Sequence, residues 1–343
     1  MFSATNAFEK NLKTKKKRTR RLNISPLRIA IIDLGTNSVR CDIYRINGKR
    51  IERLHRGKRM IRLGDGVFQS GELTQEAMNR ALHAFYAIRR QLAESHVDHV
   101  IAFGTSALRS AKNSREFLDE IRKRTHISIQ IISGQEEGRL IACGIMSSLP
   151  TPKGVFAMVD IGGGSTEISL ANGKRLLSCQ SYQLGANRLW QMYLKTVPPI
   201  HKRGQLNPVL ALRQHLKDSL HSLTVLREKY AVKTLIGSSG TIRTIGKILK
   251  KLGRSSRTIH RSDLSALISE MQTMTRSQLL KLPGLEPRRL DLILPGAILL
   301  EEVMLALNMR SVLVTDIALR DGILQRELNN LYDGETGARR AAR

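Results

Sequence analysis

A glycine-rich stretch behind an acidic residue is the part of the sequence best suited to chemistry. It reads DIGGGSTE over residues 160–167, with an apolar run before it and alternating apolar residues after it. The pattern predicts a strand, a tight loop and a second strand. Glycines leave no side chain between the backbone and a ligand, so their N–H groups can face an anion. The carboxylate of Asp160 can hold a metal ion or its water beside that anion. A β-hairpin with a glycine bulge fits the same residues.

A second copy of this pattern near the start of the chain favours the phosphate loop over the simple hairpin. Residues 29–38 contain an apolar strand, Asp33, a glycine and small residues that include Asn37 and Ser38. A third turn of small residues, at 237–241, follows another apolar strand and opens a helix. A chance hairpin does not predict its own duplicate. The repeat indicates two similar domains, each with a loop that faces one cleft, and it favours phosphate chemistry.

The elements that must position these loops follow an order that occurs twice. In the first half we expect three strands within 28–63, a helix over 73–95, a strand over 99–104, a helix after the capping box at 113–116, a strand over 127–132 and a helix after the capping box at 133–136. In the second half we expect the glycine hairpin, a helix opening at 207–208, a strand over 233–236, a helix over 241–252, helices over 262–310 that break at 283–284 and 295–296, a strand over 311–315 and a helix to residue 330. The order β-β-β-α-β-α-β-α in each half predicts an α/β fold made of two duplicated domains.

The chain divides into four segments on this interpretation. We expect a disordered basic arm over 1–25, an N-terminal domain over 26–150, a C-terminal domain over 151–330 and a frayed tail over 331–343. The last helix is expected to pack back on the first domain.

The charge of the chain points to an anionic partner. The net charge is +28, and the run from Lys10 to Arg21 together with Glu9 accounts for +7 of it, which leaves +21 for the rest. Nucleic acid, anionic lipid and a polyanionic substrate all fit such a surface. Aromatic residues make up only 4%, which argues against a platform that stacks single-stranded bases. The composition therefore favours contact with phosphate over contact with bases.

The cysteines and the hydropathy pattern predict a soluble, cytoplasmic protein. Cys41, Cys143 and Cys179 are odd in number and widely spaced, so they fit neither a disulfide framework nor a zinc site. No apolar stretch reaches the roughly 18 to 20 residues of a membrane span, and no signal-peptide pattern follows the basic run. We therefore expect no membrane contact.

Five motifs in register resemble those of the exopolyphosphatase / guanosine pentaphosphate phosphohydrolase (Ppx/GppA) family. They are DLGTNS at 33–38, GTSALRSAKN at 104–113, ISGQEE at 132–137, DIGGGSTE at 160–167 and GSSGT at 237–241. The resemblance implies the short two-domain form, with two ribonuclease-H-like domains of the actin/Hsp70/sugar-kinase superfamily and a cleft between them. It also implies hydrolysis of a terminal phosphoanhydride.

Such hydrolysis needs a cradle for the phosphates, a cation and a group that activates water. The expected cradle comprises Asn37, Ser38, Gly162, Gly163, Gly164 and Ser165. Arg109 is the favoured fixed cation and a further phosphate ligand. A surface salt bridge is the less favoured alternative for this residue.

The resemblance assigns the catalytic base to Glu137. A carboxylate in the first turn of a helix is also favoured by the helix dipole alone, and Glu136 already fits the capping box with Ser133. Glu167 is expected to face the cleft and to assist the water. Asp160 and Asp33 are expected to hold Mg²⁺ or another divalent cation through water, although each also fits the capping of a turn.

Several functions remain open at the level of sequence. The two substrates that the resemblance implies are inorganic polyphosphate, which the +21 body favours, and guanosine pentaphosphate (pppGpp). More distant alternatives are an ATP-dependent sugar or acetate kinase, an Hsp70- or actin-like ATPase, and a nucleic-acid-binding protein that uses the basic arm. We also expect a homodimer.

Overall fold

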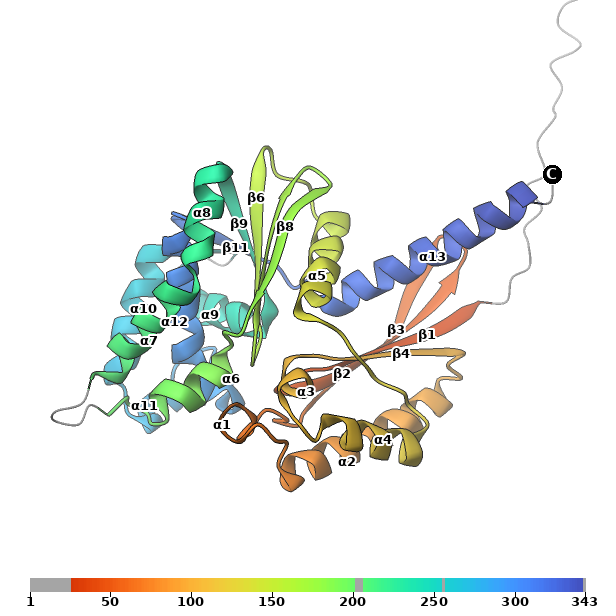
Figure 1. Cartoon of the computed structure of the whole chain (residues 1–343), viewed down its shortest axis with the longest axis horizontal. Helices are drawn as coiled ribbons and strands as arrows, with labels where there is room; N and C mark the ends of the chain where they lie inside the picture. Colours follow the sequence, from red (N-terminus) through yellow and green to blue (C-terminus); the bar gives the residue numbers. More distant parts are fainter. Residues whose placement is uncertain (1–25, 201–205, 255–256, 342–343) are drawn as a thin grey trace, which may run out of the picture.

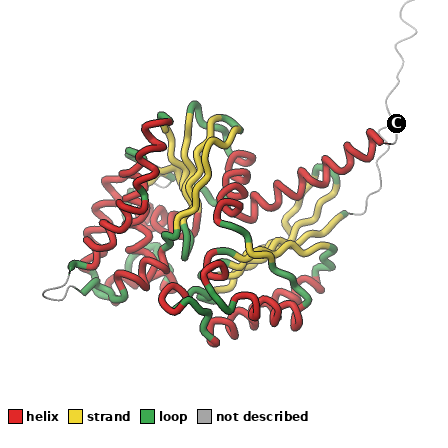
Figure 2. Tube along the Cα trace, in the orientation of Figure 1, coloured by secondary structure: helices red, strands yellow, loops and turns green. Residues whose placement is uncertain are grey.

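The chain folds into two halves, each built around one mixed β-sheet with helices on both faces (Figures 1 and 2). The computed structural model describes residues 26–200, 206–254 and 257–341. The basic arm expected over 1–25 lies outside these residues. No helix in the described part of the chain combines the length and the apolar character that crossing a membrane requires.

The first half contains a five-stranded sheet in the order β3-β2-β1-β4-β5. Its strands are β1 (Leu27–Leu34), β2 (Ser38–Asn47), β3 (Arg50–Met60), β4 (His99–Gly104) and β5 (Gln130–Ile131). Its helices are α1 (Val67–Ser70), α2 (Gln75–Glu94), α3 (Ser106–Ser110), α4 (Ser114–Thr125) and α5 (Gly134–Ser148). The first three strands pair antiparallel, whereas β4 and β5 run parallel to β1.

The second half contains a six-stranded sheet in the order β10-β11-β9-β6-β7-β8. Its strands are β6 (Val155–Ile161), β7 (Thr166–Asn172), β8 (Arg175–Tyr182), β9 (Val232–Ser238), β10 (Thr258–His260) and β11 (Ser311–Val314). Its helical segments are α6 (Ala186–Leu189), the π-helix η1 (Trp190–Leu194), α7 (Pro208–Ser219), α8 (His221–Lys229), α9 (Ser239–Lys251), α10 (Arg261–Thr273), α11 (Arg276–Leu280), the 3₁₀-helix η2 (Pro287–Arg289), α12 (Leu290–Ala306) and α13 (Leu319–Ala341).

The two sheets share one topology. In the second half β6, β7 and β8 pair antiparallel, and β9 and β11 run parallel to β6, as β4 and β5 do to β1. The strand β10 is an additional antiparallel edge. The predicted fold of two duplicated ribonuclease-H-like domains is therefore confirmed.

The core consists of three hydrophobic clusters. One lies within each half, and the third contains residues of both halves and joins them. Successive side chains of a strand point to opposite faces of its sheet. On β1 the residues that join the shared cluster are Ile29 and Ile31, so Asp33 continues the same row. The equivalent row on β6 ends in Asp160. Alternation thus turns both strand-end carboxylates toward the junction of the halves.

The last helix packs back on the first half, and α5 lies between the two sheets (Figure 1). The contact between α13 and α5 depends on glycines on both sides. A Cβ added at Gly144 would lie 2.8 Å from the backbone nitrogen of Gly322, and one added at Gly322 would overlap the carbonyl oxygen of Leu140. The two backbones therefore approach closely because neither glycine has a side chain.

We expect Gly322→Ala to lower the free energy of unfolding by about 3 kcal/mol, because the new methyl group meets rigid backbone. Urea unfolding measures the change. Gly246→Ala is the matched control, since a Cβ there finds its nearest atom, of Val314, at 3.4 Å. In helix α9 that substitution is expected to be neutral or to stabilise by up to about 1 kcal/mol. Equal unfolding midpoints for both variants would contradict the close approach.

Two predicted helix starts behave differently. Thr74 caps α2, the helix expected over 73–95, by accepting from the backbone N–H of Ala77 at 3.2 Å. Asn113 makes no side-chain cap at the start of α4. Its amide pairs with the backbone of Leu73 through bonds of 2.9 and 3.0 Å. A tertiary partner thus replaces the local cap that the sequence suggested.

Other boundaries also differ from expectation. The strand expected over 127–132 is reduced to β5, and α13 continues to Ala341 where a frayed tail was expected from residue 331. The predicted break at Pro295 is wrong, because this residue lies inside α12. Helix α12 is buried on nearly all sides, and tertiary packing of that extent overrides the low helix propensity of proline.

Candidate functional site

A cleft opens where the two halves meet, and the two predicted loops form its floor. Both strand-end aspartates, Glu137 at the start of α5 and the first turn of α9 line it as well. The loops share one turn: Gly35 N–H donates to Ser38 O at 3.1 Å, and Gly162 N–H donates to Ser165 O at 2.9 Å. The sequence repeat is therefore a structural repeat.

The glycine loop offers unpaired backbone donors. Within the described residues, no hydrogen bond uses the N–H groups of Gly163, Gly164 or Ser165. Gly163 and Ser165 line the cleft, as Asn37 and Ser38 do from the opposite loop. Unpaired N–H groups in a turn form a concavity that binds anions. The arrangement is suited to a phosphate group.

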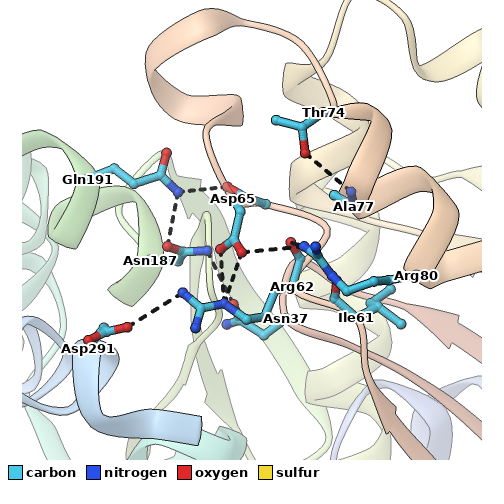
Figure 3. Close-up of polar contacts among 11 residues, drawn as sticks. Asn37, Ile61, Arg62, Asp65, Thr74, Ala77, Arg80, Asn187, Gln191 and Asp291 are labelled. Atoms are coloured by element: carbon cyan, nitrogen blue, oxygen red, sulfur yellow. Dashed lines mark hydrogen bonds and ion pairs between the residues drawn. The ribbon is translucent and has the colours of Figure 1, made fainter.

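The two loops touch each other across the cleft. A Cβ added at Gly163 would lie 2.6 Å from the amide nitrogen of Asn37, so the approach requires a glycine. The side-chain amide oxygen of Asn37 in turn accepts from the side-chain amide of Asn187, in α6, at 3.3 Å (Figure 3). Figure 3 also shows Arg62 of the first half reaching Asp291 of α12, at 3.5 Å. These contacts fix the loops relative to each other.

Gly164 has a different position from its neighbours. It is not among the described residues that line the cleft. A Cβ added there would overlap the ring of Phe68 and would lie 2.6 Å from Ser106 Oγ. Gly164 was predicted to bind phosphate as part of the cradle. It instead packs closely against Phe68 and Ser106 and does not line the cleft.

Arg109 joins the catalytic candidates of both halves. It extends from α3, and its Nη1 donates to Glu137 Oε2 and to the carbonyl oxygen of Ile132, each at 2.9 Å. Its Nη2 donates to Ser165 Oγ at 3.1 Å and lies 3.9 Å from Glu167 Oε1. The guanidinium is therefore shared between two carboxylates and the glycine loop, and the interpretation as a surface salt bridge does not describe it.

Glu137 and Glu167 form a buried acidic pair with unequal environments. Burial raises the pKa of Glu137 to about 7, against the opposing effect of Arg109. Burial, Glu137 and Asp160 together raise the pKa of Glu167 well above its usual range. Glu167 is 3% exposed, and its Oε1 accepts from Ser181 Oγ at 2.8 Å. Its Oε2 has no partner among the described residues, which is where a proton can reside.

The neighbouring Glu136 does not share this environment. Its backbone N–H donates to Ser133 Oγ at 3.1 Å, which is half of the predicted capping box. Its carboxylate pairs with Arg326 of α13 at 3.1 Å. Glu137 alone of the two lines the cleft. The structure thus separates a structural glutamate from one that faces the substrate space.

The two strand-end aspartates differ in their charge partners. Asp33 lies 3.5 Å from Arg40 and 3.5 Å from Arg320. For Asp160 burial raises the pKa, while Ser238 and Arg40 oppose the rise. No group of three or more His, Cys, Asp or Glu side chains within 26–200, 206–254 and 257–341 is placed to hold a metal ion. A cation here would have to take further ligands from a bound substrate.

A group of cations that the sequence analysis missed includes Arg40 and Arg289, which line the cleft, and two basic residues close to them. Burial, with Arg289 and Arg40 nearby, lowers the pKa of Lys58 to about 8. Burial also lowers the pKa of Arg289 to about 10, where Glu286 opposes the fall and Arg40 and Arg243 add to it. We call Arg40, Lys58, Arg243 and Arg289 the cation cluster. Arg40 follows the first loop by two residues, and that short spacing was the available signal for it.

Comparisons with known proteins agree with this geometry. The family model described as "Ppx/GppA phosphatase family" matches residues 42–331. A putative exopolyphosphatase of Haemophilus influenzae is 30% identical, over 86% of this chain and 90% of that protein. A guanosine-5'-triphosphate,3'-diphosphate pyrophosphatase of Aeromonas salmonicida is 29% identical, over 92% of this chain and 62% of that protein.

A solved structure gives the same result. The crystal structure of an exopolyphosphatase from Cytophaga hutchinsonii superposes with a TM-score of 0.79 at 29% identity, and it covers 88% of this chain and 98% of that one. The family model, the relatives and the fold point to one assignment. The chain belongs to the Ppx/GppA phosphatase family.

Proposed function

We propose that the chain is an exopolyphosphatase, which hydrolyses the terminal phosphoanhydride of inorganic polyphosphate and releases orthophosphate. The observation that carries the proposal is the contact between Glu137 and Arg109 beside unpaired N–H groups of the glycine loop. A general base near neutral pKa, a bidentate cation and an anion cradle are the three requirements of phosphoanhydride hydrolysis.

In this proposal each group has one task. The unpaired N–H groups of Gly163 and Ser165 bind the terminal phosphate, and Glu137 accepts a proton from the attacking water. A bond forms between the water oxygen and the terminal phosphorus, and the bond to the bridging oxygen breaks. The remaining chain leaves with that oxygen. Arg109 holds Glu137 in place and offsets the negative charge around the reacting phosphate.

The contacts of the two glutamates support this division of roles. Glu137 Oε2 accepts from Arg109 Nη1 at 2.9 Å, and a guanidinium at that distance favours the ionised form of the carboxyl. Glu167 has an unpartnered Oε2 among the described residues, and burial together with Glu137 raises its pKa well above the usual range. Glu167 is therefore the protonated acid that assists the water or the phosphate oxygens.

The site fits a divalent cation only in part. Mg²⁺ commonly uses one or two carboxylates and takes its other ligands from water and substrate phosphates. Asp160 lines the cleft and suits this role, whereas the charge of Asp33 is already offset by two arginines. We propose that Asp160 holds Mg²⁺ with a bound substrate and that Asp33 contributes through water. When bound, the cation neutralises charge on the phosphates.

The cation cluster favours a long polyanion as substrate. Burial is the main cause that lowers the pKa of Lys58, Arg243 and Arg289, and repulsion from neighbouring arginines, Arg40 among them, lowers it further. Phosphates that trail behind the terminal one would relieve this repulsion and release counterions. The exopolyphosphatase relatives also match this chain over 90% or more of their length, whereas the pyrophosphatase relative matches over 62%.

Two alternatives have less support. The guanosine pentaphosphate reaction uses the same groups on a shorter anion. A kinase or an ATPase of this fold needs a pocket for adenosine beside the third small-residue turn. A Cβ added at Gly240 would overlap the guanidinium of Arg289, so a cation occupies the space next to that turn.

Phosphate release from long polyphosphate, short polyphosphate and guanosine pentaphosphate, each with and without Mg²⁺, tests the proposal. We expect the highest kcat/KM with long polyphosphate and Mg²⁺, and release without any acceptor. Release from guanosine pentaphosphate alone would favour the second substrate. Transfer that requires ATP or an acceptor would contradict hydrolysis.

The pH profile follows from the pKa of Glu137. The base acts only when ionised, and burial raises its pKa to about 7 in the free protein. We therefore expect kcat/KM to fall about tenfold per unit as the pH drops below about 7. Rates measured between pH 5 and 8.5 provide the test. A flat profile from pH 5 to pH 8 would exclude Glu137 as the group that accepts the proton.

A further inference from the structure

A second recess adjoins the substrate cleft at Ser106 and Ser165, which line both. The helices α1, α3 and α6 surround it, and Figure 1 shows them together at the junction of the two halves. Arg109 lines this recess, whereas Glu137 lines the cleft. The Arg109–Ser165 contact therefore separates two spaces, and the reacting phosphate would lie next to it.

The recess is basic and contains no acidic residue among the described residues that line it. Besides Arg109 it contains Arg188 of α6 and Lys112, which follows α3. The N-terminus of α5, at Gly134, also lines it, and a helix N-terminus favours an anion. Three cations and a positive helix end thus face one space that no carboxylate of the described residues lines. Of the three, Arg109 is paired with Glu137 outside the recess, whereas Arg188 and Lys112 have no carboxylate partner among the described residues.

Arg188 is held in place although it has no carboxylate partner among the described residues. Its Nε donates to Gly164 O at 2.8 Å, and its Nη2 donates to Ser110 Oγ at 3.0 Å. Its guanidinium carbon lies 4.2 Å from the centre of the Phe68 ring. Burial and the nearby Arg109 lower its pKa. The two hydrogen bonds therefore fix the guanidinium in a place where burial and the charge of Arg109 disfavour a cation. Its Nη1 has no hydrogen-bond partner in the described residues and is free to donate to a ligand.

Lys112 adds a cation that has no structural task. Its backbone N–H donates to Gly71 O at 2.9 Å. Its ammonium group makes no hydrogen bond or ion pair with the described residues. The side chain is exposed at the mouth of the recess. A fixed guanidinium inside and a free ammonium at the mouth are suited to one doubly charged ligand.

We propose that this recess is a second phosphate-binding site, in which Arg188 and Lys112 hold a phosphate group beside the reacting one. The inference rests on the proposed function. The phosphate has two possible sources: the orthophosphate that hydrolysis releases, and a distal phosphate of the polyphosphate chain. Both present the same doubly charged oxygens to the same donors.

Titration calorimetry with inorganic phosphate on the full chain tests the site without turnover. We expect two phosphates per chain, one at the glycine loop and one in the recess. Lys112→Gln is expected to weaken the second about tenfold, which corresponds to the loss of one charge-assisted hydrogen bond. Arg188→Gln is the second variant, with urea unfolding to confirm that the loss of its contact with Gly164 O leaves the fold intact.

Steady-state kinetics of the recess variants distinguish the two sources of the bound phosphate. Weaker binding of inorganic phosphate together with weaker product inhibition assigns the recess to released orthophosphate. A raised KM for long polyphosphate, with unchanged phosphate binding and unchanged KM for tripolyphosphate, assigns it to the chain. Lys123→Gln, on the exposed face of α4, removes one charge elsewhere and is expected to change none of these values.

Unchanged phosphate binding and unchanged KM in both recess variants would overturn the proposal. The calorimetric result can be told apart from a failure of the proposed function, because binding of inorganic phosphate needs no hydrolysis. A protein that hydrolyses polyphosphate, binds one phosphate per chain and keeps its KM for long polyphosphate in both recess variants would refute the recess alone. A chain that binds two phosphates but hydrolyses nothing would refute the function alone.

Discussion

Glu137→Gln is expected to lower kcat for phosphate release by about 10²–10⁴-fold while the protein still binds polyphosphate. The magnitude is that of a lost general base. The amide keeps the shape of the side chain and an oxygen that can accept from Arg109 Nη1, now at 2.9 Å from Glu137 Oε2. Removing a negative charge beside an anion does not weaken binding, so the Kd for polyphosphate should stay equal or fall. Single-turnover phosphate release and equilibrium binding measure the two quantities separately.

Glu136→Gln is the matched control. It removes the same charge one residue earlier, where the carboxylate pairs with Arg326 on the helix surface. Phosphate release by this variant is expected to stay within a few-fold of the parent. If Glu137→Gln retains full activity, or if both variants lose activity equally, Glu137 is not the base.

Arg109→Met is expected to lower kcat by about 10²–10³-fold, the effect of removing one preorganised charged donor. The reason is its position between Glu137, Glu167 and Ser165. Without the guanidinium, nothing on α3 holds Glu137 toward the reacting phosphate. Arg109→Lys keeps the charge but loses the fork that reaches both halves, so an intermediate loss is expected.

The pH profile separates catalysis from simple loss of structure. Arg109 opposes the rise in the pKa of Glu137, so its removal raises that pKa further. The acid limb of kcat/KM in Arg109→Met is therefore expected to move to higher pH. Arg109→Lys keeps the positive charge, so a smaller shift is expected for it. Arg115→Met, an exposed arginine of α4, is the control with the same change of charge. An unmoved acid limb would show that Arg109 does not act through Glu137.

Much of the site followed from local patterns in the sequence. The alternation of β1 and β6 turned Asp33 and Asp160 toward the junction of the halves, because a strand has a fixed period of two. The same rule placed Glu167 opposite Asp160 in the register of β6 and β7. Glu167 itself is buried and is not among the described residues that line the cleft. The repeat of the two loops also followed from the matching order of residues at 29–38 and 155–167.

What the sequence could not supply depends on how separate elements pack. The Arg109–Glu137 contact joins residues 28 positions apart, and it exists only because α3 and the start of α5 meet at the edge of one sheet. Arg289 reaches the turn at Gly240 from a different helical segment. The helix through Pro295 likewise depends on burial that no local propensity contains.

The central claim is that water attacks the terminal phosphorus of polyphosphate in this cleft. Hydrolysis of polyphosphate in ¹⁸O-labelled water, followed by mass spectrometry of the products, tests it most directly. The account predicts one ¹⁸O atom in every released orthophosphate and none in the shortened chains. Label at the end of the shortened chains, with the first orthophosphate of each chain released unlabelled, would place the attack on an inner phosphorus and would contradict the account.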